Sequence, residues 1–170
     1  MAARSRLSER AFAMTSIIIL LERKMQWSDS RKSGSVTFTS CKPFPLVFTD
    51  VKIPFEPSQF GGDGTEIRRS ICFSDVAADV RKQHADMEES IGATSLCIRD
   101  EFVRCKINME KVRCFDESRK IVDAPKEWRG LNASARVSIK GKWATKQSSG
   151  LSLEVTDIQL SRAREEPCPF

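Results

Sequence analysis

The sequence contains no tyrosine, only one histidine and no pair of cysteines in a C-x-x-C arrangement. A zinc site needs clustered soft ligands, and neither the six cysteines nor His84 supplies them at a zinc-binding spacing. We therefore expect no metal site and no cofactor. We interpret the scattered cysteines as reduced thiols, which indicate an intracellular, reducing compartment.

Motifs of catalysis are also missing from the chain. We find no nucleophile–base pair, no carboxylate pair within a motif, and neither phosphate-binding glycine pattern in residues 59–65, where we expect a hairpin turn. His84 lies on or beside the apolar stripe of a predicted helix, which favours a packing role over a catalytic one. We therefore expect no enzyme and no catalytic residue, although a metal-dependent nuclease with dispersed acids stays open.

No apolar run is long enough to span a bilayer. The apolar residues 11–21 follow Arg4, Arg6 and Arg10, and a membrane span needs about 20 apolar residues. The alternatives for this segment are a packing helix, an organellar presequence or an extension ahead of a later start. We treat residues 1–33 as an N-terminal extension, disordered or helical, and expect no membrane partner.

The most regular pattern of the chain lies in residues 134–160. In the first arm small or apolar residues alternate strictly with polar and cationic ones, which predicts a strand with one buried face. The second arm repeats this alternation from Leu151 but slips by one residue near Thr156, as a β-bulge would cause. The two arms predict a long bulged hairpin that closes at residues 148–150 and carries a row of cations on its outer face.

The remaining segments predict further strands and one helix. Alternating residues 35–41 and 46–53, separated by two prolines, predict two strands, and residues 66–73 predict a third. An amphipathic helix is expected to follow an N-cap pair at residues 74–75, to carry apolar residues at steps of three and four, and to end at Gly92.

Positive charge is concentrated in residues 101–146, which hold 12 basic and 6 acidic residues. In the predicted strands 101–108 and 109–115, cations alternate with a phenylalanine on the face opposite the small apolar residues. Such cations neutralise phosphates and such rings stack on bases, unless a loop covers the rings and the charged face is merely solvated. Trp143 shares the phase of the core and qualifies only at the exposed end of its strand. The candidate nucleic-acid-binding residues are Phe102, Arg104, Lys106, Lys111, Arg113, Phe115, Arg136, Lys140, Lys142 and Trp143.

The last residues of the chain form an acidic, proline-containing tip with a terminal phenylalanine, EEPCPF. This tip resembles that of bacterial single-stranded DNA-binding proteins, which docks replication and repair enzymes. The resemblance implies a C-terminal tail over residues 161–170 in which Glu165, Glu166 and Phe170 bind a partner.

The body of the chain resembles the single-stranded DNA-binding protein of short-tailed lytic phages. The resemblance covers the order of strands, glycine turn, capped helix and closing hairpin, and its most specific part is L-x-L-x-V-x-x-I-x-L ending at Leu160, after Lys140, Trp143 and Gly150. It implies a mainly β domain over residues 34–160, an OB-fold-like five-stranded antiparallel barrel with one amphipathic helix. Because tyrosine is absent, any stacking by tyrosine in that family passes here to phenylalanine or tryptophan.

These observations lead to one hypothesis and one alternative. We expect a viral or virus-derived protein that binds single-stranded DNA without sequence specificity in replication, recombination or repair, in the host cytoplasm or nucleus or in an organelle. The alternative is a β-barrel module that binds RNA or another protein as a structural or adaptor component. The sequence leaves open the preference for DNA or RNA and the oligomeric state, a homodimer included.

Overall fold

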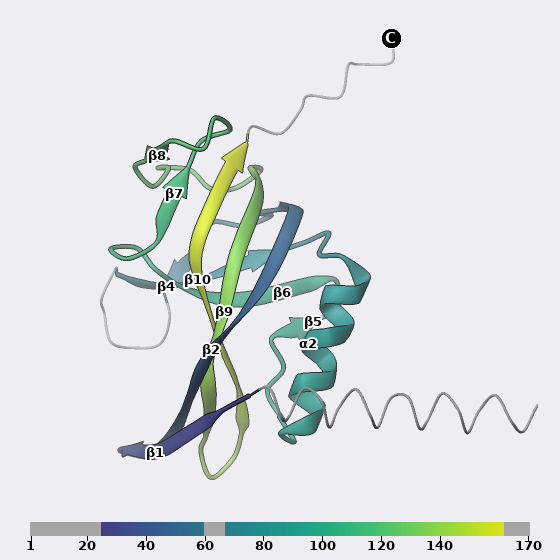
Figure 1. Cartoon of the computed structure of the whole chain (residues 1–170), viewed down its shortest axis with the longest axis vertical. Coiled ribbons are helices and arrows are strands. Elements are labelled where there is room, and N and C mark those ends of the chain that lie inside the picture. Colours follow the sequence, from purple (N-terminus) through teal and green to yellow (C-terminus); the bar gives the residue numbers. More distant parts are fainter. Residues whose placement is uncertain (1–24, 60–66, 162–170) are drawn as a thin grey trace, which may run out of the picture.

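The computed structural model describes residues 25–59 and 67–161 and places them in ten strands and one helix (Figure 1). The expectations for residues 1–24, for most of the glycine-rich turn and for the tail from residue 162 onward lie outside the described residues. In chain order the elements are β1 (Trp27–Ser33), β2 (Val36–Lys52), β3 (Ser58–Gln59), β4 (Arg68–Phe73), α2 (Ala78–Ser90), β5 (Ile98–Arg99), β6 (Phe102–Asn108), β7 (Arg113–Phe115), β8 (Ile121–Val122), β9 (Asn132–Ala144) and β10 (Ser149–Ser161).

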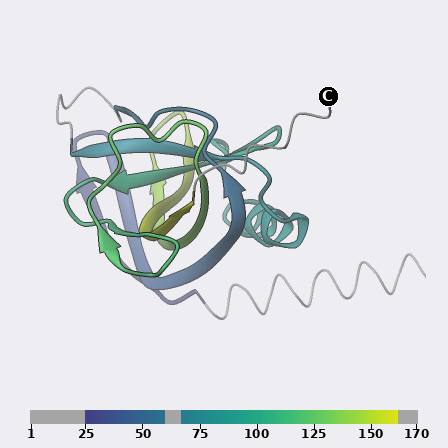
Figure 2. The same cartoon turned by 90° about the horizontal axis from the view of Figure 1, so that it is seen from above.

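All ten strands belong to one strongly bent sheet. Its main path is β1-β2-β9-β10-β6-β4-β3, with β5 paired to β6, β7 paired to β10, and β8 paired to β7. The two ends of the path β2-β9-β10-β6-β4 meet at one bridge. There Lys52 N–H donates to Ser74 O at 3.1 Å and Ser74 N–H donates to Lys52 O at 2.9 Å. Seen from above, the strands curl around a common interior (Figure 2).

The mainly β class, the single amphipathic helix and the OB-fold-like architecture are confirmed for the described residues. The predicted strand segments fall in β2, β4, β6, β7, β9 and β10, whereas β1, β3, β5 and β8 extend the sheet beyond the expected five strands. One bridge does not make a complete barrel. In addition, β10 pairs in parallel with β6 and β7. This pairing is feasible because the long connection through residues 116–131 and β9 returns the chain in the same direction.

The predicted hairpin is formed by β9 and β10. The register shifts between Val155 and Asp157, so the bulge is confirmed where the sequence pattern slips. The turn closes at Thr145, whose N–H donates to Ser148 O at 2.7 Å, and not at residues 148–150. The Thr145 hydroxyl also accepts the Ser148 N–H at 3.0 Å, and this side-chain bond fixes the earlier turn.

Strand β2 joins the two strands predicted for residues 35–41 and 46–53. Its pairing with β9 skips between Ser40 and Phe44, so Pro43 lies in a bulge where the ladder is interrupted, whereas Pro45 pairs with Ser138. Strand β1 pairs with β2 from residue 27 onward, so the sheet begins within the expected N-terminal extension. Most of β1 is exposed, which is why its residues show no apolar alternation.

Helix α2 begins three residues after the predicted N-cap pair. Asp75 has a φ of +59° and forms an ion pair with Lys52 (Nζ to Oδ2, 3.5 Å), so it belongs to the connection from β4 and not to a helical turn. The predicted end is confirmed, because Gly92 has a φ of +63° and its N–H donates to Glu89 O at 3.0 Å. Within the described residues, no helix has both the length and the apolar character needed to cross a membrane.

Residues 109–112 form a turn and not the first half of a strand. The Asn108 side chain accepts the Glu110 N–H at 3.0 Å, and the Lys111 N–H donates to Asn108 O at 3.1 Å. Asparagine favours such turns because its amide competes with the ladder for backbone partners. The predicted strand 109–115 is therefore reduced to β7.

Candidate nucleic-acid interface

A groove opens at the end of the sheet where β9 turns into β10. It has a volume of about 410 Å³ and lies between β2, β4, β6, the hairpin tip and the segment 95–99. We call it the hairpin groove. Its lining includes three cations and two aromatic rings, and no Asp or Glu is among the described residues that line it. The cations are Arg99, Arg104 and Lys106, and the rings are Phe38 and Trp143.

The two rings of the hairpin groove pack against glycines, which leave room for them. Phe38 and Trp143 are cross-strand partners in the β2–β9 ladder, and Trp143 pairs on its other side with Gly150. A Cβ atom at Gly150 would lie 3.1 Å from Trp143 Cζ2, and one at Gly141 would lie 2.8 Å from Phe38 Cζ. Trp143 is half-buried and next to the last residue of β9. Trp143 therefore lies near the end of its strand, which is the position that we required for a base-stacking role.

The alternation of β6 positions two of the three cations. The small apolar residues of this strand are buried, whereas Arg104 is exposed and Lys106 is half-buried, so the predicted phase is confirmed. Burial, as the main cause, lowers the pKa of the Lys106 ammonium from its usual value. The Arg104 backbone N–H donates to Cys97 O at 2.9 Å and so holds the segment with Arg99 beside β6.

A second basic hollow lies between the start of β9, the end of β10, and β7. This β7 hollow, of about 360 Å³, is lined by Arg113, Phe115, Arg119 and Arg136 among others. It also contains an acid, because Arg113 Nη2 lies 2.5 Å from Asp157 Oδ1. Part of its positive charge is therefore neutralised within the protein.

The remaining predicted residues lie in neither hollow. Phe102 is half-buried and its ring centroid is 5.5 Å from that of Phe55. Lys142, on β9, has its Nζ 4.6 Å from the centroid of the Trp27 ring and does not line the hairpin groove. Lys111 is exposed in the turn before β7, and Lys140 is half-buried on β9. The ten predicted residues are thus distributed over several surfaces, with three in the hairpin groove.

Sequence reasoning missed Phe38 and Arg99. The glycines could have indicated that a residue such as Phe38 packs there. A glycine within an alternating strand often marks a place where another group approaches the backbone closely. Gly141 and Gly150 both stand in such strands. For Arg99 we find no local signal, because β5 has only two residues and follows an irregular segment.

Four of the five thiols of the described residues have a raised pKa. None of the five forms a disulfide, and Cys41, Cys105 and Cys114 are buried in strands as expected. Burial raises the pKa of each of these three. Burial and, secondly, the nearby Glu88 carboxylate raise the pKa of Cys97 to about 12. Because the thiolate is the reactive form, these four thiols are weak nucleophiles at neutral pH.

Comparison with known proteins identifies the fold. No protein-family model and no curated protein sequence matches the chain. The single-stranded DNA-binding protein of bacteriophage Enc34, in complex with single-stranded DNA, superposes with a TM-score of 0.54 at 15% identity, covering 85% of this chain and 98% of that one. Its C-terminally truncated form gives 0.52 at 13% identity and covers 86% and 99%. The expected resemblance to a phage single-stranded DNA-binding protein is therefore confirmed at the level of the fold.

Proposed function

We propose that the chain binds single-stranded DNA in the hairpin groove. The observation that carries this proposal is the composition of the groove, which brings three cations and two aromatic rings together without an acidic residue among its described lining. Arg99, Arg104 and Lys106 neutralise phosphates, and Phe38 and Trp143 stack on bases. The solved neighbour of the same fold supports the proposal, since it is in complex with single-stranded DNA.

The same composition favours binding without sequence specificity. Every base has a flat face that a ring can stack on, and every nucleotide carries a phosphate that an arginine can neutralise. A DNA duplex hides these flat faces within its base stack. Single strands are therefore the form of DNA that this groove suits.

The wider assignment rests on the sequence. We propose an intracellular, non-enzymatic role in replication, recombination or repair, carried out by the domain of residues 34–160 with β1 added to its sheet. Glu165, Glu166 and Phe170 would dock a replication enzyme, but they lie outside the described residues. The β7 hollow and Lys111, Lys140 and Lys142 would form a further basic surface along the path of a longer strand.

Titration of a fluorescently labelled oligo-dT with the full chain, followed by anisotropy, tests the proposal. With three phosphates neutralised, the slope of log K against log salt is about −2, so affinity falls about twentyfold from 50 to 200 mM salt. Duplex DNA of the same length should compete poorly. An affinity that does not change with salt, or a complete lack of binding, would contradict the proposal.

RNA is the alternative ligand that the experiment has to separate from DNA. Unlabelled RNA and DNA of equal length and base composition are used as competitors against the labelled oligo-dT. Stronger competition by RNA would assign the groove to RNA, because the 2′-hydroxyl is the group by which a protein distinguishes the two.

A further inference from the structure

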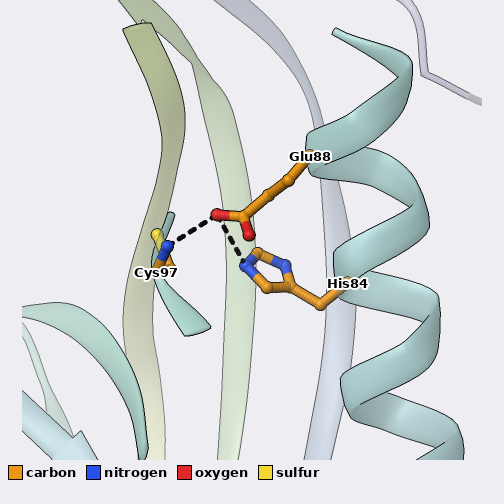
Figure 3. Close-up of side chains that lie close together, drawn as sticks. All are labelled: His84, Glu88 and Cys97. Carbon is orange, nitrogen blue, oxygen red and sulfur yellow. Dashed lines mark hydrogen bonds and ion pairs between the residues drawn. The ribbon is translucent and has the colours of Figure 1, made fainter. Parts of the chain in front are cut away.

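Three side chains that can bind metal meet between α2 and β5. Figure 3 shows the His84 imidazole and the Glu88 carboxylate pointing toward each other, with the carboxylate also joined to the backbone nitrogen of Cys97. Their ligand atoms all lie within 4.8 Å of one another. His84 and Glu88 are 1% and 2% exposed, and Cys97 is half-buried. The sequence spacing hides this cluster, because the thiol is separated from the imidazole by a helix end and a turn.

The backbone fixes the cluster in place. His84 and Glu88 are one helical turn apart and so project from the same face of α2. The Cys97 N–H donates to Glu88 Oε1 at 2.7 Å. The segment before Cys97 is bound to the hairpin, since the Thr94 and Ser95 N–H groups donate to Ser149 O at 3.0 and 2.8 Å. The three donors are therefore preorganised on two elements.

The imidazole has no hydrogen-bond partner among the described residues. Neither Nδ1 nor Nε2 of His84 makes a hydrogen bond, although Nε2 lies 3.3 Å from Glu88 Oε1, at ion-pair distance. Leaving a buried polar atom unpaired costs about 1–3 kcal/mol. A cation bound between the nitrogen and the carboxylate would compensate both groups at once.

We propose that His84, Glu88 and Cys97 bind a zinc ion. Nitrogen, oxygen and thiolate sulfur are the ligands that zinc prefers, whereas a thiol disfavours magnesium and calcium. The sulfur binds after its proton passes to solvent, and water supplies the fourth ligand of a tetrahedral site. The alternative is a buried His84–Glu88 ion pair beside a Cys97 thiol that keeps its proton and donates to Leu151 O at 3.6 Å. A Cys–His nucleophile is disfavoured, because Cys97 is a protonated thiol beside a carboxylate.

A zinc ion bound here would affect the hairpin groove, because one of its ligands lines that groove. Cys97 belongs both to the cluster and to the lining of the groove, and Arg99 follows two residues later. Zinc would attach this segment to α2 in addition to the bonds that attach it to the hairpin. The proposed role of the ion is to hold this segment in place, and it does not depend on which polymer the groove binds.

Cobalt is the probe that tests the site, because Co²⁺ replaces Zn²⁺ and reports a thiolate ligand by absorbance. Full-length protein, freed of metal with a chelator and kept reduced, is titrated with Co²⁺ and then with Zn²⁺. We expect a near-ultraviolet sulfur-to-cobalt charge-transfer band that saturates at one ion per chain and disappears on adding one equivalent of zinc. A folded protein without this band would overturn the proposal.

Substitutions in the cluster test whether the charge-transfer band comes from these three residues. Cys97→Ser should remove it, and His84→Gln should weaken zinc binding at least about 100-fold, since loss of an outer-shell partner alone costs about 10–100-fold. Cys72→Ser, which changes a thiol of β4 outside the cluster, is the matched control and should keep the band. Retention of the band in Cys97→Ser would contradict the assignment.

Folding and function are measured beside metal binding. Far-ultraviolet circular dichroism shows whether each variant is folded, and the wild-type protein is melted with and without one equivalent of zinc as a second test. A rise in Tm with zinc that is absent in folded Cys97→Ser supports the site, and an unchanged wild-type Tm argues against it. Oligo-dT affinity is recorded in parallel, so that a failed metal site and a failed DNA site give different results.

Discussion

Trp143 and Phe38 have their places in the hairpin groove because the residues beside them are glycines. Both rings are flat and partly exposed. A ring held against the backbone on one side and open to a groove on the other is suited to stack on a base. The individual ring is therefore the smallest unit at which the proposed function can be tested.

Replacing Trp143 with leucine should weaken single-strand binding while keeping an apolar cover over Gly150. Stacking of one base contributes about 1–3 kcal/mol, so Trp143→Leu should lose about 5- to 150-fold in affinity for oligo-dT. Anisotropy at fixed salt measures this loss. Trp27→Leu is the matched control, because Trp27 lies beside Lys142 and outside the groove. Equal losses in the two variants would mean that Trp143 has no special role.

Lys106 leads to a prediction on pH. Burial lowers its pKa, so its charge, and the phosphate contact that needs it, is present at low pH and is lost as pH rises through that lowered value. Wild-type affinity should therefore decline at a pH below the range in which an ordinary lysine loses its charge. The loss should be about 10- to 150-fold, the size of one contact to a charged group. Lys106→Arg should flatten this decline, because a guanidinium stays charged.

The control for this pH profile is Lys111→Arg, the same substitution at an exposed turn outside the groove. It should leave the alkaline decline as it is in the wild-type protein. If Lys106→Arg behaves like this control, the lysine in the groove does not contact phosphate.

At the scale of elements, the close approach of β2 and β9 depends on Gly141. A Cβ atom there would press on the Phe38 ring and on the Thr39 carbonyl. Gly141→Ala should therefore destabilise the fold by about 1–3 kcal/mol, the usual cost of overpacking, and lower Tm by about 2–12 °C. Thermal unfolding followed by circular dichroism measures the change.

A second glycine provides the comparison for this variant. Gly34 has a φ of +59° in the exposed β1–β2 turn, and a Cβ atom there would meet no neighbour within 4 Å. Gly34→Asn should shift Tm little, because asparagine tolerates this backbone region. A Gly141→Ala protein as stable as Gly34→Asn would show that β2 and β9 do not approach so closely.

Strands with one buried face are predictable from the sequence, and strands without one are not. β6, β9 and β10 follow from alternation because every second residue lies in the core. β1 is exposed along most of its length and Ile121 of β8 is 72% exposed, so neither shows a pattern. The helix was predictable in its body and its end. Its start was not predictable, because Asp75 of the predicted capping pair has a positive φ and lies in the connection that precedes the helix.

The candidate site was predictable only as a set of residue types. Alternation correctly places Arg104 and Lys106 on the face of β6 opposite the core. Which of the distant cations share a groove depends on the bending of the sheet and on register shifts, for which the local pattern has no information. The cluster around His84 depends in the same way on bonds from residues 94–95 to the hairpin.

Across the whole molecule, the β9–β10 hairpin has a basic hollow near each of its ends. The hairpin groove has Arg99 and Arg104 without an acid in its described lining, whereas in the β7 hollow an arginine is paired with Asp157. A short strand should therefore occupy the hairpin groove first. A longer strand has a second basic surface available along the same pair of strands.

Salt dependence distinguishes the two hollows, because each phosphate contact to a single strand contributes about 0.7 to the slope of log K against log salt. Arg99→Gln with Arg104→Gln should make the slope for a short oligo-dT shallower by about 1.4. Arg119→Gln with Arg136→Gln removes the same charge from the β7 hollow, leaves the Arg113–Asp157 pair intact, and should not change that slope. The reverse result would move the binding site to the β7 hollow. Equal effects would mean that even a short strand contacts both.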